Sequence, residues 1–150
     1  MNTSHSIRPM KPNELRQVTD IWLNANLDAH AFIPADYWHS QLPSVSAQIA
    51  QAEIYVCESA GEIQGFIGLS GSYIAGIFVK KGARSNGIGT ALLSFVKTFR
   101  DSLSLSVYCK NTAAIRFYQR NGFHPGDRST DQETNEPELC LTWNRLTEIP

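Results

Sequence analysis

Apolar positions recur with helical spacing in the first third of the chain. Between residues 15 and 29 they fall at every third or fourth position, which is typical of an amphipathic helix, and Asn13 stands where it can cap that helix. A short strand is expected around Ile7. Residues 31–52 contain two prolines and several aromatic side chains, and we expect there a loop followed by a second helix over about residues 44–52.

The period then changes from helical to strand-like. Residues 54–59 and 63–69 carry β-branched and aromatic side chains and are separated by the turn Ala60-Gly61-Glu62, so they predict a β-hairpin. Residues 73–80 follow closely and predict a third strand. Together these segments indicate an antiparallel meander.

The second half of the chain alternates between helix and strand. Apolar spacing predicts a helix over 87–99, and alternation of apolar residues with serine predicts a strand over 103–107 with one buried face. Asn111 can cap a short helix over 112–121, which Gly122 can end as a left-handed residue. The last expected elements are strands near 122–128 and 139–143, joined by a polar loop over 129–138.

This order of elements predicts an α+β (mixed α/β) domain. Helices and strands mix along the whole chain, so we expect a three-layer arrangement in which helices cover a central sheet. No repeat, low-complexity tract or linker divides the 150 residues, and this length is that of one ordinary domain. Residues 1–150 are therefore expected to form a single domain.

Composition and charge exclude several classes of protein. Hydrophobic residues make up 42% of the chain and charged residues 18%, which is too apolar for intrinsic disorder. Thirteen basic and fourteen acidic residues leave a net charge of −1, which predicts neither nucleic acid nor an anionic membrane as a partner. We also expect no membrane span and no secretory signal. Three scattered cysteines and four histidines without ligand spacing predict reduced thiols, a cytoplasmic location and no metal site.

Residues 77–90 carry the strongest chemical signal. A predicted strand runs into a loop with three cations, Lys80, Lys81 and Arg84, and the loop opens directly into a helix at Gly87. A helix start exposes unpaired backbone N–H groups and a partial positive charge, and glycine lets an anion approach them. The pattern favours a phosphate-bearing ligand; an ordinary connection with solvated lysines is the alternative.

Two familiar nucleotide loops do not fit this segment. Residues 82–87 have the glycine spacing of a nucleoside-triphosphate loop, but Ile88 and Gly89 replace the lysine and the hydroxyl residue that hold the terminal phosphate and Mg²⁺. The run from Gly87 to Gly89 begins a dinucleotide pattern, but Leu92 occupies the position of its last glycine. Neither kind of nucleotide binding is therefore expected.

The segment instead resembles the acetyl-coenzyme A loop of the GNAT superfamily of N-acetyltransferases. Its pattern, Gln/Arg-x-x-Gly-x-Gly/Ala, matches residues 84–89, and the family's Asn-x-x-Ala-x-x-Phe-Tyr-x-x-x-Gly-Phe matches residues 111–123. With both motifs in order, the chain is similar to this family over essentially its whole length. The resemblance implies a central, mostly antiparallel sheet of about seven strands flanked by about four helices.

The resemblance also implies roles for particular residues. Acetyl-CoA is the implied cosubstrate and CoA the product, with the pantetheine arm on the strand before the loop and the pyrophosphate on the loop itself. Tyr118 is the implied catalytic acid, because a phenol is protonated at neutral pH and can donate to the departing thiolate. The implied donor-binding residues are Ile77, Phe78, Val79, Arg84, Ser85, Asn86, Gly87, Ile88, Gly89, Thr90 and Asn111.

Within the superfamily, the chain is most similar to the small bacterial YiaC/YjaB-like acetyltransferases. The similarity is carried by residues 30–33, 37–38, 107–108 and 110–111.

The general base is not identified by this resemblance, because the strand starting Ser72-Tyr73-Ile74 lacks the acidic residue that is the base in many relatives. His30 has the pKa range of a base and lies in the segment where relatives bind the acceptor. Glu58, Tyr108 and Glu133 are alternatives that act through an ordered water.

The acceptor is expected to be an amine, either of a small molecule or of a protein lysine or N-terminus, that attacks directly in a ternary complex. The acidic residues between 131 and 136 favour a cationic acceptor, with a solvated hairpin tip as the alternative. A non-catalytic acyl-CoA sensor or interaction module is the alternative function, and the oligomeric state stays open. The candidate acceptor-binding residues are Trp22, His30, Phe32, Tyr37 and Tyr73, although aromatic side chains also build cores.

Overall fold

The computed structural model describes residues 5–84 and 86–147. Ser85, an expected donor-binding residue, lies outside this range. In chain order the main elements are β1 (Ser6–Pro9), α1 (Leu15–Ala29), α2 (Ala35–Gln51), β2 (Glu53–Ser59), β3 (Glu62–Ser70), β4 (Tyr73–Val79), α3 (Ile88–Lys97), β5 (Ser102–Tyr108), α4 (Thr112–Arg120), β6 (His124–Thr130) and β7 (Pro137–Asn144). Short 3-10 turns cover Pro12–Glu14, Lys81–Ala83 and Arg145–Thr147.

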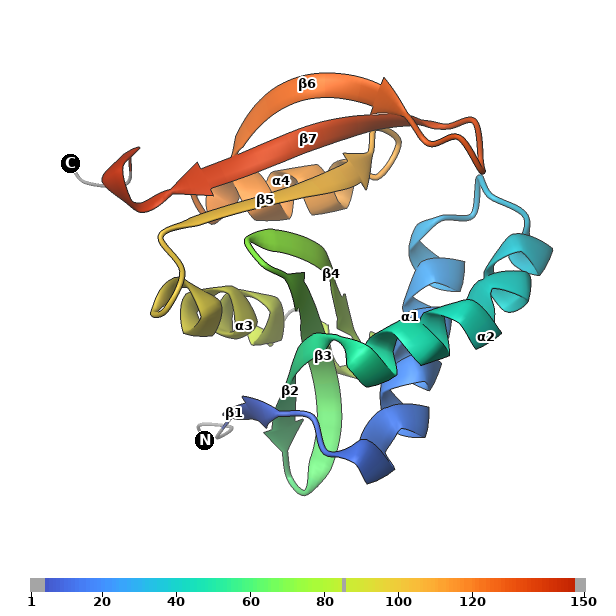
Figure 1. Cartoon of the computed structure of the whole chain (residues 1–150), viewed down its shortest axis with the longest axis vertical. Helices are drawn as coiled ribbons and strands as arrows, with labels where there is room; N and C mark the ends of the chain where they lie inside the picture. Colours follow the sequence, from blue (N-terminus) through green and yellow to red (C-terminus); the bar gives the residue numbers. More distant parts are fainter. Residues whose placement is uncertain (1–4, 85, 148–150) are drawn as a thin grey trace.

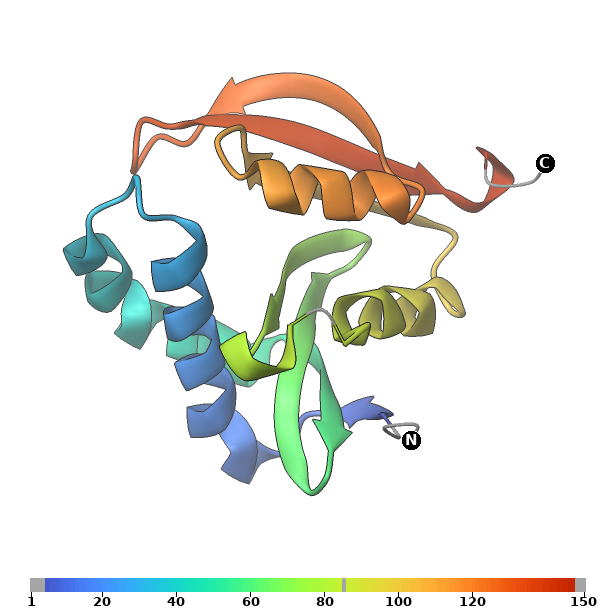
Figure 2. The same cartoon turned by 180° about the vertical axis from the view of Figure 1, so that it is seen from behind.

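The strands form one seven-stranded sheet in the order β1-β2-β3-β4-β5-β7-β6. Neighbouring strands are antiparallel except for β4 and β5, which run parallel. Figures 1 and 2 show two halves, β1–β4 and β5–β7, with the helices packed around them. The predicted α+β architecture with a mostly antiparallel sheet is confirmed.

Alternation along the strands explains the two cores on the two faces of β1–β4. On β2, Ile54 and Val56 belong to a core that α1 and α2 cover, whereas Cys57 belongs to a second core that α3 covers. Successive side chains of a strand point to opposite faces, so a strand buried on both sides contributes to both cores. The second core continues under β5 and β7 through Leu105 and Leu141.

The second helix is longer than the sequence predicted. Helix α2 begins at Ala35, immediately after Pro34, and continues through Pro43 to Gln51. Pro43 is exposed, so its ring faces solvent, while Trp38 is buried against Trp22 with the ring centroids 5.9 Å apart. This tertiary contact stabilises the turns before Pro43, which an isolated proline would interrupt.

Two further local expectations are corrected. Asn13 lies inside the first 3-10 turn instead of capping α1. The Glu14 carboxylate instead accepts the backbone N–H of Lys11 at 2.8 Å and pairs with Arg8 at 2.7 Å, and these contacts hold the pKa of Glu14 low, at about 2, with the hydrogen bonds from Arg8 as the largest cause. The loop between β6 and β7 is also shorter than expected, because Thr130 and Pro137 pair across the hairpin.

Two classes of feature are not found in the described residues. No helix there has the length and hydropathy needed to cross a membrane. No group of three or more histidine, cysteine, aspartate or glutamate side chains lies close enough to hold a metal ion.

Candidate functional site

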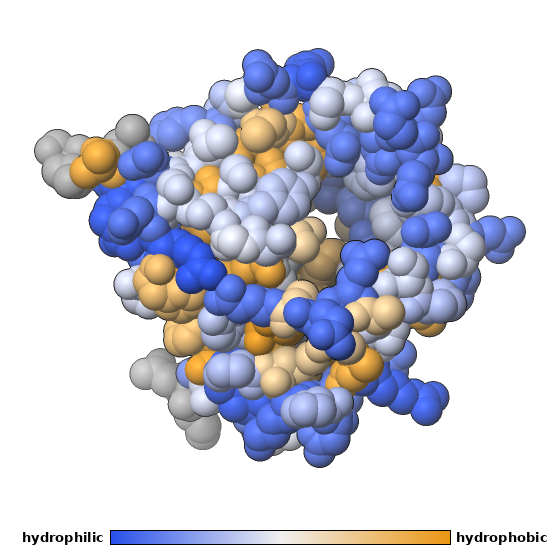
Figure 3. Space-filling view, in the orientation of Figure 1, coloured by the Kyte–Doolittle hydropathy of each residue, from blue (hydrophilic) through white to orange (hydrophobic). Residues whose placement is uncertain are grey.

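A pocket lies where the two halves of the sheet separate. The parallel strands β4 and β5 pair at Tyr73 and Ser104, and beyond that pair their carboxyl ends diverge (Figure 1). The space between them holds a pocket of about 640 Å³ bordered by α1, β4, the start of α3 and α4. Figure 3 shows the molecule hollowed between the two halves. A concave site of this size, with apolar walls and a few polar groups, suits a small-molecule ligand.

Most residues that the sequence assigned to the acetyl donor meet in this pocket. The exceptions are Ser85, which lies outside the described range, and Asn86, which is exposed and whose carbonyl oxygen accepts a hydrogen bond from His5 at 3.3 Å. The expected residues that line the pocket are Ile77, Phe78, Val79, Arg84, Gly87, Ile88, Gly89, Thr90, Asn111 and Tyr118.

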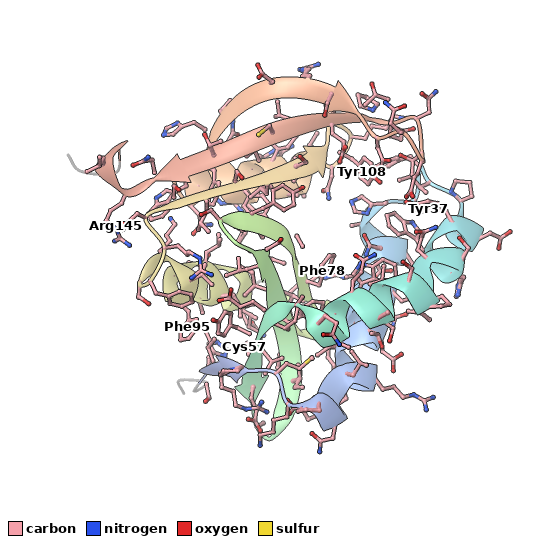
Figure 4. All side chains as sticks on the ribbon, viewed as in Figure 1. Tyr37, Cys57, Phe78, Phe95, Tyr108 and Arg145 are labelled. Carbon is pink, nitrogen blue, oxygen red and sulfur yellow. The ribbon has the colours of Figure 1, made fainter. Side chains whose placement is uncertain are left out.

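The edge of β4 that faces the pocket carries backbone groups that do not pair with β3. The Lys80 N–H donates to the Gln64 carbonyl of β3 at 2.8 Å. Backbone direction alternates along a strand, so the N–H and C=O groups of Val79 and Ile77 point the other way, toward the diverging β5. A ligand with amide groups can pair with them as an added strand does. The Phe78 side chain lies on the other face of the sheet from those of Ile77 and Val79 and points toward the middle of the molecule (Figure 4).

The start of α3 forms the end of the pocket that suits an anion. Gly87 is its N-cap and has a φ of +79°, a left-handed conformation that favours glycine. The first N–H groups of a helix have no partner within it, and those of Ile88, Gly89 and Thr90 lie at this end. Gly89 has a second role that the sequence did not reveal, because a Cβ there would lie 2.8 Å from the ring of Phe117 on α4.

Arg84 is held beside this helix start by weak contacts. Its Nε donates to the Val79 carbonyl at 3.3 Å, and its guanidinium pairs with Asp28 of α1 at 3.4 Å. Both side chains of this pair are more than a third exposed, so the pair is screened by water and contributes little to stability. Breaking the ion pair with Asp28 therefore costs little free energy, and the Arg84 guanidinium is able to bind a phosphate instead.

Helix α4 carries Tyr118 into the pocket. The Asn111 side chain accepts the Ala114 N–H at 3.2 Å, which confirms it as the helix cap, and Gly122 beyond the helix has a φ of +91°. Tyr118 is 6% exposed and packs edge-on against Phe117 and Phe123. Burial raises the pKa of the Tyr118 phenol, with a smaller contribution from Tyr73. The phenol is therefore protonated throughout the physiological range.

His30 lies at the end of α1 and lines the same pocket. Its Nδ1 is 3.0 Å from the side-chain oxygen Oδ1 of Asn26, and its Nε2 is 3.0 Å from the Asn111 side-chain nitrogen. Burial lowers the pKa of His30 to about 4, so the imidazole is neutral at pH 7. Sequence reasoning missed Asn26, although a polar residue one turn from His30 on the apolar face of a helix is a usable signal.

The remaining candidates for acceptor binding divide into two groups. Trp22 is buried in the core beneath α2, and Tyr73 is 43% exposed at the opposite end of β4. Phe32 lies beside the pocket, with its ring centroid 5.6 Å from that of His30 and 5.7 Å from that of Tyr108. Of these three, Phe32 is the one placed to contact a ligand near His30.

Tyr37 and Tyr108 face the loop between β6 and β7 at the outer edge of this region (Figure 4). This loop, residues 131–136, is called the acidic loop below. The Tyr37 hydroxyl donates to Glu133 at 2.6 Å, and the Tyr108 hydroxyl donates to Asp131 at 2.6 Å. Burial, and then the carboxylate partner, raises the pKa of each phenol. Burial and the charge of Asp131 also raise the pKa of Glu138. The acidic loop therefore concentrates carboxyl groups next to a cluster of aromatic side chains. This cluster, called the aromatic wall below, consists of Phe32, Tyr37, Trp38 and Tyr108.

The three alternative bases occupy different surroundings. Glu58 pairs with Arg8 at 3.2 Å on the β1–β2 edge and is not among the described residues that line the pocket. Glu133 holds Tyr37 at the acidic loop. Tyr108 has its hydroxyl committed to Asp131.

The fold and the glycine-bearing helix start define an acyltransferase class, and comparison with known proteins identifies the family. A family model described as an acetyltransferase (GNAT) domain matches residues 50–125. The chain belongs to the GNAT family of acetyltransferases, as the two sequence motifs predicted.

Individual relatives support the predicted subgroup. The chain is 37% identical over 139 residues to the peptidyl-lysine N-acetyltransferase YiaC of Escherichia coli, covering 91% of this chain and 95% of YiaC. The solution structure of apo YjaB from Escherichia coli matches with a TM-score of 0.84 and 26% identity, covering 93% of this chain and 97% of that one. The PaiA N-acetyltransferase of Thermoplasma acidophilum, crystallised with coenzyme A, shares the fold with a TM-score of 0.79 and 17% identity, covering 94% of this chain and 99% of that one.

Proposed function

We propose that this acetyltransferase moves the acetyl group of acetyl-CoA to the side-chain amine of a protein or peptide lysine. The observation that carries the proposal is the convergence, in one pocket, of a free strand edge, an open helix start and a buried tyrosine. These three features suit an amide-bearing arm, a pyrophosphate and a departing thiolate, respectively. The YiaC relative, named a peptidyl-lysine N-acetyltransferase, supports lysine as the acceptor class.

The chain's own residues would bind the donor at three places. Backbone groups of Ile77 and Val79 pair with the amides of the pantetheine arm, and the Val79 N–H is placed to polarise the thioester oxygen. The N–H groups at the start of α3, together with Arg84, bind the pyrophosphate. Asn111 offers a side-chain N–H to the arm from the opposite wall.

Tyr118 would supply the proton that the leaving group needs. Acetyl-CoA brings a thioester, whose carbonyl carbon is attacked by the neutral amine while the carbon–sulfur bond breaks. The Tyr118 hydroxyl donates its proton to the departing sulfur, which prevents the thiolate from reversing the reaction. The amine loses a proton to a base that acts through water, and the acidic loop offers carboxylates beside Tyr37 and Tyr108.

The acidic loop would also select the acceptor. The carboxyl groups of Asp131 and Glu133 accept hydrogen bonds from Tyr108 and Tyr37, and the ring of Phe32 lies against Tyr108. The acceptor side therefore combines acidic groups with apolar surface. Hydrogen bonds from the Tyr108 hydroxyl and from backbone N–H groups outweigh burial and lower the pKa of Asp131. A lysine within a basic stretch of peptide suits this combination, because its aliphatic stem can pack on the rings.

The test is an acetylation assay with matched acceptors. Peptides with a central lysine in basic or acidic surroundings, the same peptides with arginine in place of that lysine, and free polyamines are incubated with acetyl-CoA. Released thiol and the mass of each product are measured. We expect a single added acetyl group on lysine peptides, with basic peptides preferred. CoA binding without thiol release from any acceptor would favour the sensor alternative and contradict the proposal.

A further inference from the structure

A continuous string of hydrogen bonds links α1 to α4 across the pocket. It begins at the Trp22 carbonyl, which accepts from the Asn26 Nδ2 at 2.9 Å. It continues from Asn26 to His30 and from His30 to Asn111, at 3.0 Å in each case. It ends at the Ala114 N–H, 3.2 Å from the Asn111 Oδ1. Both ends are therefore backbone groups.

These backbone ends decide the direction of every bond in the string. The Trp22 carbonyl can only accept, so Asn26 presents its NH₂ group there and its oxygen to His30. The Ala114 N–H can only donate, so Asn111 presents its oxygen there and its NH₂ group to His30. His30 must then donate from Nδ1 and accept at Nε2, which defines one neutral tautomer.

The surroundings of the ring favour the same neutral form. The ring stacks on Trp38, with centroids 5.4 Å apart and 29° between the planes, and Tyr108 and Phe32 approach it edge-on at 5.0 and 5.6 Å. Burial in this aromatic wall penalises a charged imidazolium, in agreement with its lowered pKa. A protonated ring would also lose the acceptor that Asn111 requires.

We propose that His30 is a positioning residue for the acetyl donor, which holds the Asn111 amide so that its second N–H is available to a carbonyl oxygen of the pantetheine arm. An amide NH₂ group has two N–H donors, and His30 takes one of them. The proposal rests on the proposed function, because it assumes that the donor occupies this pocket. It also removes His30 from the candidate bases, since the Nε2 lone pair is occupied.

The first measurement is made on the unaltered protein. Long-range ¹H–¹⁵N correlation spectra distinguish a protonated from an unprotonated ring nitrogen, and His30 is assigned by comparison with His30→Gln. We expect the proton on Nδ1 and an unprotonated Nε2 at pH 7. A proton on Nε2 would overturn the proposal, and this result does not depend on any ligand.

The second measurement is CoA binding by titration calorimetry. His30→Ala frees the Asn111 amide, and we expect CoA to bind about 3- to 10-fold more weakly, which is the effect of about one neutral hydrogen bond. His30→Gln keeps an acceptor oxygen near the position of Nε2, so it should restore most of the affinity. His39→Ala, at an exposed position of α2, is the matched control and should bind normally.

The outcomes separate this inference from the proposed function. Normal CoA binding by His30→Ala would overturn the positioning role while leaving the donor pocket intact. Failure of the unaltered protein to bind CoA would contradict the proposed function itself. In acetylation kinetics, the positioning role raises KM for acetyl-CoA more than it lowers kcat, whereas loss of a base would lower kcat with little change in that KM.

Discussion

Tyr118 combines two properties that a proton donor to a thiolate needs. It lies in the last turn of α4, lines the same pocket as the N-cap residue Asn111, and is buried among Phe117 and Phe123. Burial disfavours the charged phenolate, so the phenol keeps its proton and could donate it to a thiolate formed beside it.

Removing the hydroxyl of Tyr118 should affect chemistry more than binding. Tyr118→Phe keeps the ring and its contacts, so we expect kcat to fall about 10²- to 10⁴-fold where chemistry limits the rate. The affinity for acetyl-CoA and the melting temperature should change little. Steady-state kinetics and thermal unfolding measure the three quantities. Tyr55→Phe, which removes a hydroxyl that donates to Glu53 and whose residue is not among those lining the pocket, is the control. Near-normal turnover in Tyr118→Phe would remove this residue from the mechanism.

His30 should make stability depend on pH in a defined direction. Its pKa is lowered in the folded state from 6.5 to about 4, so the unfolded chain takes up the proton first as the solution is acidified. The contribution of the neutral ring is complete above pH 6.5 and is lost as the pH falls toward 4. Denaturant unfolding at pH 7.5 and 5 should therefore show a larger loss of stability for the unaltered protein than for His30→Gln. An equal loss in both proteins would contradict the lowered pKa.

At the scale of elements, the start of α3 is built by two glycines with different tasks. Gly87 provides the left-handed turn, and nothing lies within 4 Å of a Cβ added there. Gly89 lets α3 approach α4, because the ring of Phe117 occupies the space of its missing side chain. The first glycine therefore shapes the mouth of the pocket, and the second sets the distance between its walls.

Replacing Gly87 should abolish CoA binding in addition to straining the backbone. Gly87→Val places a branched side chain at the helix start and imposes a left-handed conformation on a β-branched residue. We expect lower stability and no rise in melting temperature on adding CoA. Gly71→Val is the matched control, because Gly71 has a φ of +60° in the β3–β4 turn and is not among the residues that line the pocket. It should lose stability but keep the CoA-induced rise.

That comparison separates strain from ligand blockage. A CoA-induced rise that survives in Gly87→Val would mean that the anion site lies elsewhere. Loss of the rise in both variants would mean that general destabilisation, and not the loop, controls binding.

At the scale of the whole molecule, one core joins the two halves of the sheet. Ile67 and Ile74 of the first half belong to the same buried cluster as Leu105 and Trp143 of the second. The halves therefore share apolar burial although β4 and β5 pair at a single position and then diverge. The pocket occupies the region that this shared core does not fill.

The shared core predicts a single unfolding transition. Because neither half can expose its side of the cluster without exposing the other, we expect thermal unfolding followed by backbone circular dichroism and by tryptophan fluorescence to coincide. CoA should shift the whole transition upward by mass action. Two separate transitions would contradict the prediction that residues 1–150 form one domain.

The local elements followed from the sequence because their causes are short-range. Apolar spacing defined α1, alternation defined β5, and the Asn111 cap and Gly122 defined the limits of α4. The two motifs also indicated the family, since each motif lies within a single stretch of the chain. These features depend on residues only a few positions apart.

Tertiary structure decided the features that join distant residues. Contact of Trp38 with Trp22 extends α2 back to Ala35, against the local effect of Pro43. The neutral tautomer of His30 depends on Asn111, which is 81 positions away, so a lone histidine in the sequence was consistent with a base. A hydrogen bond or ring contact across such a distance requires the folded arrangement of helices around the split sheet. The chemical role of a polar side chain is decided by its partners there, and its residue type alone leaves that role open.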